Sequence, residues 1–355
     1  MPVEPILSVR NLTTEFRTRG HAVRAVDALS YDLLPGKTLA VVGESGSGKT
    51  VSALSILRLL PEPPARVAAG EIFFGGRDLL RLPAEDMRRI RGDRIAMIFQ
   101  EPMTSLNPVM RVGDQIAEAV VEHRGLAADA AAGRAEILLG KVGIPDPGGR
   151  MRDYPHQFSG GMRQRVMIAM ALSCEPDILI ADEPTTALDV TIQAQILELI
   201  RRLQSELRMA LLLITHNIGV VAEMADDIVV MYAGRAVEKA PAETVFRSCR
   251  HPYTRALLDS VPSIYTRKQR LTAIPGQPPD LALAGPAAGC PFAPRCAEAL
   301  ERCAREDPPE YVLSGTHMSN CWLCEGSASE RRRRGGSLPL PGPASQGERG
   351  APAAL

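Results

Sequence analysis

One octapeptide near the start of the chain limits what the rest can fold into. Residues 43–50 read GESGSGKT, directly after the apolar run TLAVV and directly before VSALSILRLL. The pattern G-x-x-x-x-G-K-[ST] between a strand and a helix is typical of a phosphate-binding loop, whose glycines let backbone N–H groups face phosphate oxygens. We expect Lys49 to reach the β- and γ-phosphates and Thr50 to ligate Mg²⁺. The eight loop residues are Gly43, Glu44, Ser45, Gly46, Ser47, Gly48, Lys49 and Thr50. The alternative is a chance glycine turn.

The sequence divides into three parts of different character. Up to about residue 246, apolar runs such as DILIAD, ALLLIT and DIVVMY alternate with helical patterns, which predicts a parallel sheet flanked by helices. Residues 113–171 lack strand runs and predict a helical insertion. Residues 247–325 have a looser pattern and hold most of the cysteines. Residues 326–355 are rich in Gly, Ser, Pro and Arg, and we expect a disordered tail.

Composition argues against several classes of protein. Lys and Arg number 41 and Asp and Glu also number 41, with aromatic residues at 4%, so nucleic acid is not an expected partner. The N-terminus lacks the features of a secretory signal, and no apolar run approaches the roughly 18 residues that span a bilayer. We therefore expect a cytosolic protein whose membrane role, if any, comes through partners. Seven cysteines in that compartment are not expected to form structural disulfides.

Candidate catalytic residues lie at the ends of three predicted strands. Asp182 and Glu183 follow the run ILIA, where Asp182 can complete a Mg²⁺ site and Glu183 can polarise a water for attack on the γ-phosphate. An acidic pair opening a helix is the alternative. His216 follows ALLLIT and can touch the γ-phosphate, or serve as a helix cap. Gln100 follows IAMIF and can orient water or ligate the metal.

These motifs together resemble a known family. The P-loop, Gln100, FSGGM at 158–162, ILIADEP at 178–184, ALD at 187–189 and His216 have the order and spacing of the nucleotide-binding subunits of ATP-binding cassette (ABC) transporters. The resemblance covers residues 1–246. It implies an α/β fold, the P-loop NTPase of ABC cassettes, with a parallel-sheet core, an antiparallel β-subdomain and a helical signature subdomain, followed by a small cysteine-containing C-terminal extension.

The resemblance also implies roles for individual residues. In that family the signature loop caps the γ-phosphate of ATP bound to a second subunit, which assigns Ser159, Gly160 and Gly161 to a neighbour's nucleotide. A helix N-cap is the alternative for Ser159. Phe158 and Met162 depart from the commoner wording LSGGQ, but FSGGMRQRV is typical of oligopeptide and dipeptide importers. Phe16 matches the aromatic that stacks on adenine, with a core aromatic as the rival interpretation. Asp189 matches the interface aspartate, and Gln100 with EPMTSLNP resembles the segment that contacts the transmembrane subunits.

The C-terminal part resembles the extension of peptide-importer ATPases in HPYTRALLDSVP, IPGQPPD and GCPFAPRC. The family comparison implies a [4Fe–4S] cluster on Cys290, Cys296, Cys303 and Cys321; four thiolates suit zinc equally, and Cys324 can replace Cys321. Free cysteines in a loose loop are the remaining alternative. The run RRRR at 331–334 can touch anionic lipid or stay solvated.

The function that the resemblance implies is an ATPase that powers peptide import. Its implied cofactors are ATP and Mg²⁺. Its implied partners are a second ATPase subunit, which the resemblance favours as a paralogue, two transmembrane permease subunits and an extracytoplasmic solute-binding protein. Its place would be the cytoplasmic face of the inner membrane, as a peripheral subunit. Alternatives are the ATPase of a nickel or glutathione importer, a soluble ABC ATPase of DNA repair or translation, and a metal or redox sensor. The sequence does not identify the transported solute.

Overall fold

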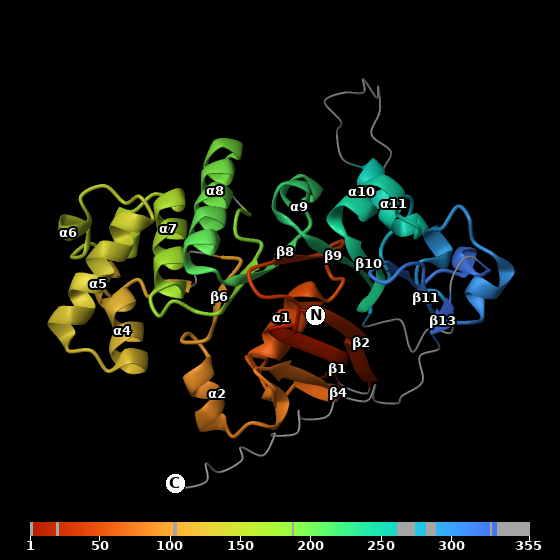
Figure 1. Ribbon diagram of the computed structural model, residues 1–355, viewed down its shortest axis with the longest axis horizontal. Helices are drawn as coiled ribbons and strands as arrows, with labels where there is room; N and C mark the ends of the chain where they lie inside the picture. Colours follow the sequence, from red (N-terminus) through yellow and green to blue (C-terminus); the bar gives the residue numbers. More distant parts are fainter. Residues whose placement is uncertain are drawn as a thin grey trace, which may run out of the picture.

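Two β-sheets with different strand directions organise the chain (Figure 1). The computed structural model describes residues 3–18, 21–101, 105–186, 188–260, 274–281, 289–326 and 329–331. The larger sheet has the strand order β13-β11-β12-β10-β9-β3-β8-β7-β6, and the smaller has the order β2-β1-β4-β5. The strands are β1 Leu7–Thr18, β2 His21–Leu33, β3 Thr38–Val42, β4 Ala65–Phe74, β5 Arg77–Asp78, β6 Ile95–Ile98, β7 Ile178–Asp182, β8 Ala210–Thr215, β9 Asp227–Tyr232, β10 Arg235–Pro241, β11 Glu310–Val312, β12 Met318–Ser319 and β13 Ser329–Arg331.

The centre of the larger sheet is parallel. Strands β6, β7, β8, β3 and β9 run in one direction, with β3 paired to both β8 and β9. Every residue of β3, β7 and β8 is buried, which explains why these strands read as unbroken apolar runs rather than alternating ones. The predicted parallel-sheet core is confirmed, and the carboxyl ends of β3, β7 and β8 meet at one edge.

The helices lie on both faces of this sheet and at one end of it (Figure 1). They are α1 Lys49–Ile56, α2 Ala84–Ile90, α4 Val112–Arg124, α5 Ala128–Lys141, α6 Pro147–Arg150, α7 Gly160–Ala171, α8 Val190–Leu207, α9 Ile218–Met224, α10 Ala242–Ser248 and α11 Pro252–Asp259. Helices α4 to α7 form the expected helical insertion, which packs on α8 and β6 through one apolar cluster. Helix α1 ends at Ile56, four residues before the predicted end of that helix.

The smaller sheet is antiparallel and forms the β-subdomain that the resemblance implied. Its apolar face shares one cluster with α1 and with the β3, β7 and β8 strands, where Leu12, Ile56 and Leu212 are fully buried. The P-loop helix is therefore wedged between the two sheets. This packing fixes the helix that begins at Lys49 against both.

The C-terminal residues continue the larger sheet, which the sequence did not predict. Strand β12 pairs antiparallel with β10 through Glu238↔Ser319 and Lys239↔Met318, and β11 and β13 follow. Strands of two or three residues are too short to show the alternation that identifies a strand in a sequence. The predicted boundary between residues 246 and 247 falls inside α10.

An aromatic cluster joins this region to the sheet face. The ring of Tyr232 at the end of β9 lies 4.6 Å from that of Tyr253 and 5.3 Å from that of Phe292. All three are buried and share a cluster with Val42 of β3. Aromatic contacts of this kind add to the stabilisation from buried area. The C-terminal region thus packs against β3, the strand that leads into the P-loop.

Several predictions concern residues near the C-terminus. Of the predicted disordered tail, the structure describes Gly326 and residues 329–331, which form β13, and the remainder lies outside the described residues. The same holds for Arg332, Arg333 and Arg334 of the arginine run. Among the helices of the described residues, none combines the length and apolar character needed to cross a bilayer.

Candidate active site

The loop of residues 43–50 joins β3 to α1 and curls tightly at two glycines. A Cβ at Gly43 would lie 2.2 Å from the Met231 carbonyl oxygen, and one at Gly48 would lie 2.1 Å from the Ala25 carbonyl oxygen. Gly48 also has a φ of 94°, a left-handed conformation that favours glycine. Side chains at either position would displace the backbone. The P-loop prediction therefore agrees with the geometry, because only glycine fits where the pattern requires it.

Lys49 is buried in its own loop. Its Nζ donates to the carbonyl oxygens of Gly43 and Glu44, each at 2.9 Å. Lys49 is also the first residue of α1. Burial lowers the pKa of Lys49, and the carboxylates of Glu183, Asp182 and Glu44 oppose that effect. The ammonium group therefore lies between the loop backbone and the acidic residues.

Asp182 and Thr50 form an oxygen-rich pair that suits Mg²⁺. Thr50 Oγ1 donates to Asp182 Oδ1 at 3.2 Å across 132 residues of sequence. Burial raises the pKa of Asp182 to about 6, with the hydrogen bond from Thr50 acting against it. A hydroxyl and a buried carboxylate are ligands that Mg²⁺ prefers, and a cation there would favour the ionised form of the acid. These residues therefore fit the implied metal.

Glu183 is held by three side chains. Its Oε1 lies 2.9 Å from His216 Nδ1, and its Oε2 accepts from Gln100 Nε2 at 3.1 Å and from Thr186 Oγ1 at 2.8 Å. Burial raises the pKa of Glu183, but the hydrogen bonds from His216 and Thr186 outweigh it and hold the pKa below its usual value. The carboxylate is thus kept ionised and fixed in direction, as a base that accepts a proton from water requires.

The backbone of Glu183 adopts an uncommon conformation. Its φ is 48°, and its N–H donates to the Ile214 carbonyl oxygen at 2.8 Å, although the regular pairing of β7 ends at Asp182. A non-glycine residue in the left-handed region costs on the order of 1 kcal/mol, which the surrounding structure must supply. After this turn the two acids have different partners. Asp182 faces Thr50, and Glu183 faces His216 and Gln100.

The predicted catalytic residues are brought together. Glu183, His216 and Gln100 follow β7, β8 and β6 and form one hydrogen-bonded group. This group lies beside Asp182 and the P-loop, which follows β3. Gln100 lies two residues past the end of β6 rather than at it, and its amide nitrogen is engaged by Glu183. Its predicted role as a metal ligand stays a prediction. Residues 102–104 of the following EPMTSLNP segment lie outside the described residues.

The signature loop lies apart from this group. Ser159 Oγ accepts from the Met162 N–H at 3.3 Å and caps α7, as the helix-cap alternative proposed. Figure 1 shows α7 among the helices of the insertion, away from α1. Ser159 and Gly160 are exposed, and a Cβ at Gly161 would lie 2.8 Å from Ile192 Cγ2. A cap role and a role toward a second molecule's nucleotide are compatible, because the exposed helix start still presents N–H groups.

Asp189 and Phe16 are also placed outside the hydrogen-bonded group. Asp189 Oδ1 accepts from the Ile192 N–H at 2.9 Å and caps α8. Phe16 lies on β1, opposite Val23 of β2 and Ala65 of β4, and is half-buried. It belongs to none of the buried core clusters among the described residues. This leaves its ring available for stacking, and the predicted roles of both residues stay predictions.

The cysteines of the C-terminal region share one neighbourhood. Burial, together with the smaller effects of the Cys303 and Cys296 thiols, raises the pKa of Cys290 to about 11. Burial likewise raises the pKa of Cys321 to about 12. Within the described residues, no group of three or more His, Cys, Asp or Glu side chains is arranged to hold a metal ion. The structure therefore does not support the predicted [4Fe–4S] cluster or its zinc alternative.

Three residues that contact the site were not identified from the sequence. Thr186 donates a hydrogen bond to Glu183 and is the third residue after Glu183, in a tight turn. That short spacing is the one feature of the sequence that could have suggested this contact. Tyr253 and Arg295 contact Glu44 of the P-loop from the C-terminal region. Their separation from Glu44, more than two hundred residues, gives no local signal.

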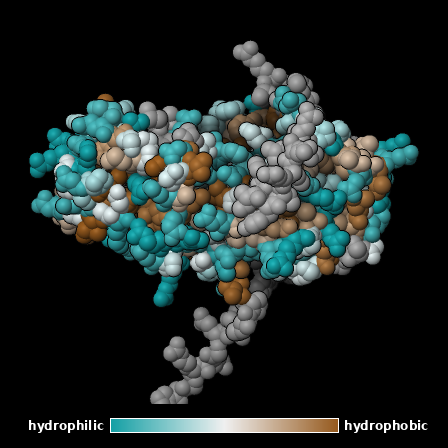
Figure 2. Space-filling model, turned by 90° about the horizontal axis from the view of Figure 1, so that it is seen from above, coloured by the Kyte–Doolittle hydropathy of each residue, from teal (hydrophilic) through white to brown (hydrophobic). Residues whose placement is uncertain are grey.

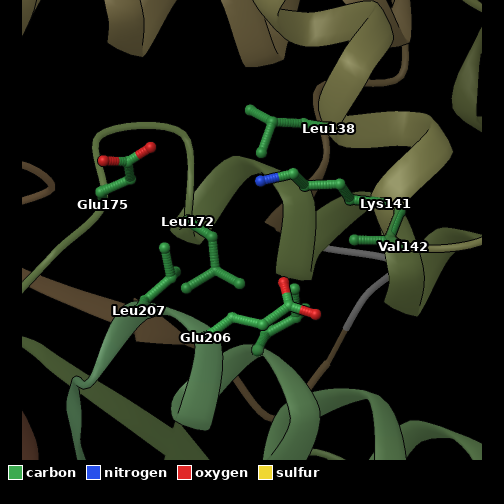
Figure 3. A pocket seen from close by; sticks show the side chains of 8 residues that line it. Leu138, Lys141, Val142, Leu172, Glu175, Glu206 and Leu207 are labelled. Atoms are coloured by element: carbon green, nitrogen blue, oxygen red, sulfur yellow. The ribbon is translucent and has the colours of Figure 1, made fainter.

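A small hollow lies elsewhere and is not part of the site. It lies between α5, the end of α7 and α8 and is open to solvent (Figure 3). Figure 3 shows the Leu138 and Leu172 side chains on opposite sides of it and the charged end of Lys141 between them. The hollow contains none of the predicted site residues.

Comparisons with known proteins agree with this geometry. Residues 26–186 match the ABC transporter family, and residues 237–303 match the family described as oligopeptide/dipeptide transporter, C-terminal region. The dipeptide transport ATP-binding protein DppD of Bacillus subtilis strain 168 is 53% identical over 321 residues, which cover 90% of this chain and 95% of that protein. The oligopeptide transport ATP-binding protein OppD of the same strain is 49% identical, over 92% of this chain and 91% of that protein.

Two solved structures share the fold. The ATP-binding cassette MJ0796, described as a dimer in a post-hydrolysis state bound to ADP and Pi, has a TM-score of 0.60 and 25% identity, and covers 66% of this chain and 98% of its own. The protein cbiO1 from Clostridium perfringens, described as part of an ABC transporter complex, has a TM-score of 0.59 and 25% identity, over 69% of this chain and 92% of its own.

The hydroxyl of Thr186 should set the acid limb of the pH–rate profile. Its hydrogen bond lowers the pKa of Glu183, so Thr186→Val should raise that pKa. A carboxyl whose pKa is raised becomes ionised only at a higher pH. The acid limb of the ATPase pH–rate profile should therefore move to higher pH. Initial rates measured from below pH 4.5, the ordinary pKa of a Glu carboxyl, up to pH 8 follow this limb. Thr185→Val, the same change one residue away, is the control; an unmoved limb in Thr186→Val would remove Glu183 as the titrating base.

Proposed function

We propose that ATP hydrolysis by this chain drives the uptake of di- or oligopeptides through a membrane permease. The chain belongs to the family of ATP-binding subunits of ABC peptide importers. The ABC family and the ATPase class follow from the matched families and from relatives that are about half identical over nine-tenths of the chain. The observation that carries the catalytic part is the hydrogen-bonded carboxylate of Glu183 beside the P-loop.

The chain's own residues divide the work of hydrolysis. Lys49 leaves the loop carbonyls to bind phosphate oxygens, and backbone N–H groups of the P-loop hold the remaining oxygens. Thr50 and Asp182 would hold Mg²⁺, which offsets the charge of the phosphates when bound. Glu183 accepts a proton from the attacking water, with its direction fixed by Thr186 and Gln100. His216 keeps the carboxylate ionised and is more than half exposed, so it can also reach the γ-phosphate.

The exposed surface supports the assembly with partners. Val190 and Val109 are 82% and 80% exposed, the highest values among the large hydrophobic residues that the structure describes. Val190 follows the interface candidate Asp189, and Val109 follows the segment that resembles the permease contact. Figure 2 shows hydrophobic residues interspersed with hydrophilic ones over one face. We infer that these two residues are covered by a second ATPase subunit and by a permease subunit.

In the proposed assembly, the signature loop completes a neighbour's ATP site. Ser159 and the start of α7 would face the γ-phosphate of ATP held by the P-loop of the second ATPase subunit, and that subunit would do the same here. The dimers described for MJ0796 support such an arrangement. ATP binding would close the pair and hydrolysis would reopen it. Two permease subunits and an extracytoplasmic binding protein would complete the importer at the cytoplasmic face of the membrane.

The same proposal includes the identity of the transported solute and the metal content of the cysteine region. The names of the relatives DppD and OppD, which are transport proteins for dipeptides and oligopeptides, favour di- or oligopeptides over nickel or glutathione as the cargo. They also favour a transport role over that of a soluble mechanical ATPase. The [4Fe–4S] cluster on Cys290, Cys296, Cys303 and Cys321 stays a prediction. Iron and zinc content of protein purified without oxygen decides between a cluster, zinc and neither.

Ser159→Arg should separate the two nucleotide sites of the pair. Since the P-loop of this chain is untouched, its own affinity for ATP should stay within about twofold. ATPase activity of the assembled pair should fall by roughly 10², the cost of losing donors to a developing phosphate charge. Asp146→Arg, a cationic change at the cap of α6 in the same helical subdomain, is the control. Weaker ATP binding by the isolated Ser159→Arg chain would place the loop at its own nucleotide.

The cargo proposal predicts which solute stimulates the complex. In vesicles with permease and binding protein, ATPase activity should rise severalfold with a di- or oligopeptide, because cargo release requires the closed pair. Nickel and glutathione should leave the rate at its basal value. Phosphate release is the measurement, and stimulation by nickel or glutathione alone would overturn the peptide assignment while leaving the ATPase assignment intact.

A further inference from the structure

The second residue of the P-loop is held from the C-terminal region. The carboxylate of Glu44 accepts two hydrogen bonds from Arg295, from Nη1 to Oε2 at 2.6 Å and from Nη2 to Oε1 at 2.9 Å. The backbone N–H of Glu44 donates to the hydroxyl oxygen of Tyr253 at 2.9 Å. Tyr253 is fully buried, and the Arg295 side chain is 5% exposed. Two residues more than two hundred positions away thus fix one residue of the phosphate-binding loop.

Arg295 is itself held in place. Its Nε donates to the Pro275 carbonyl oxygen at 2.8 Å, and its Nη1 also donates to the hydroxyl of Tyr232 at 3.2 Å. Its guanidinium lies 5.7 Å from the centre of the Tyr232 ring. A planar group with this many fixed partners presents its fork in one direction, which is what a paired contact with a carboxylate requires. A lysine has one charged atom and cannot make the same contact.

Glu44 connects this contact to the lysine of the loop. Its carbonyl oxygen accepts from Lys49 Nζ at 2.9 Å and from the Ser47 N–H at 3.2 Å. Its carboxylate is also one of the charges that act on the pKa of Lys49, so its charge is felt where phosphates bind. ATP carries several negative charges, and an unpaired carboxylate at this position would repel it. Arg295 supplies the opposite charge.

We propose that Arg295 is a positioning residue for nucleotide binding, which cancels the charge of Glu44 and fixes the P-loop, so that the C-terminal region sets the affinity for ATP. The inference rests on the nucleotide site proposed above. It extends that function, because it gives the region that the sequence marks by PGQPPD and the cysteines a direct action on the loop. The rival interpretation is that the contact between Arg295 and Glu44 only holds the C-terminal region against the cassette. In that case the charge of Arg295 would have no effect on the affinity for ATP.

Equilibrium titration of the full chain with Mg·ATP tests the inference. Arg295→Met should raise the Kd for ATP by about tenfold or more, because it leaves the Glu44 carboxylate unpaired. Adding Glu44→Gln to Arg295→Met removes that charge and should bring the Kd back to within about threefold of the wild type. The penalty of Arg295→Met should also shrink as salt is raised, since ions screen the exposed charge. A docking role predicts neither the rescue nor the salt dependence.

Three further variants make every outcome decisive. Lys239→Met removes another ion pair that joins β10 to the C-terminal region, with Glu310 at 2.7 Å, and should leave the Kd unchanged. Arg295→Lys keeps the charge in case Arg295→Met does not fold, and its Kd should lie between those of the wild type and Arg295→Met. An unchanged Kd in both Arg295 variants, or no rescue by Glu44→Gln, overturns the inference. If Lys49→Ala binds ATP normally, the nucleotide site itself is wrong.

Discussion

The left-handed turn at Glu183 is the constraint on which the candidate active site depends. Strand β7 is buried along its whole length, so it delivers Asp182 to the sheet edge beside Thr50 with little freedom. At the next residue the backbone leaves the strand with a φ of 48°, held by the Ile214 carbonyl. Without that turn the two carboxylates would point to opposite faces of the sheet, as neighbouring strand residues do. With it, one acid serves the metal and the other the water.

The pKa values of the two acids separate for the same structural reason. Asp182 is almost wholly buried and has one hydrogen-bond donor, so burial decides and its pKa rises. Glu183 receives donors on both oxygens, which outweigh its partial burial. A cation beside Asp182 would favour its ionised form and so offset the effect of burial, which couples the ionisation of that acid to the metal. Glu183 needs only its protein partners.

Sequence reasoning found the parts of the site that short patterns encode. The P-loop, the Asp182–Glu183 pair, His216 and Gln100 follow buried strands, and apolar strands followed by polar residues are visible in a sequence. It missed Thr186, Tyr253 and Arg295, because their contacts depend on a turn geometry or on chain segments far apart. It also missed strands β11 to β13, which are two or three residues long and are formed by pairing with β10 rather than by their own pattern. The C-terminal region therefore looked separate in the sequence and is continuous with the cassette in the fold.

The role of Glu183 as the base can be measured by comparing ATP binding and ATP turnover in Glu183→Gln. The amide keeps the size of the side chain and loses the proton acceptor. If Glu183 is the base, ATP affinity stays near the wild-type value and the single-turnover rate falls by roughly 10² or more. Hydrolysis at close to the wild-type rate would contradict that role and would place the base elsewhere.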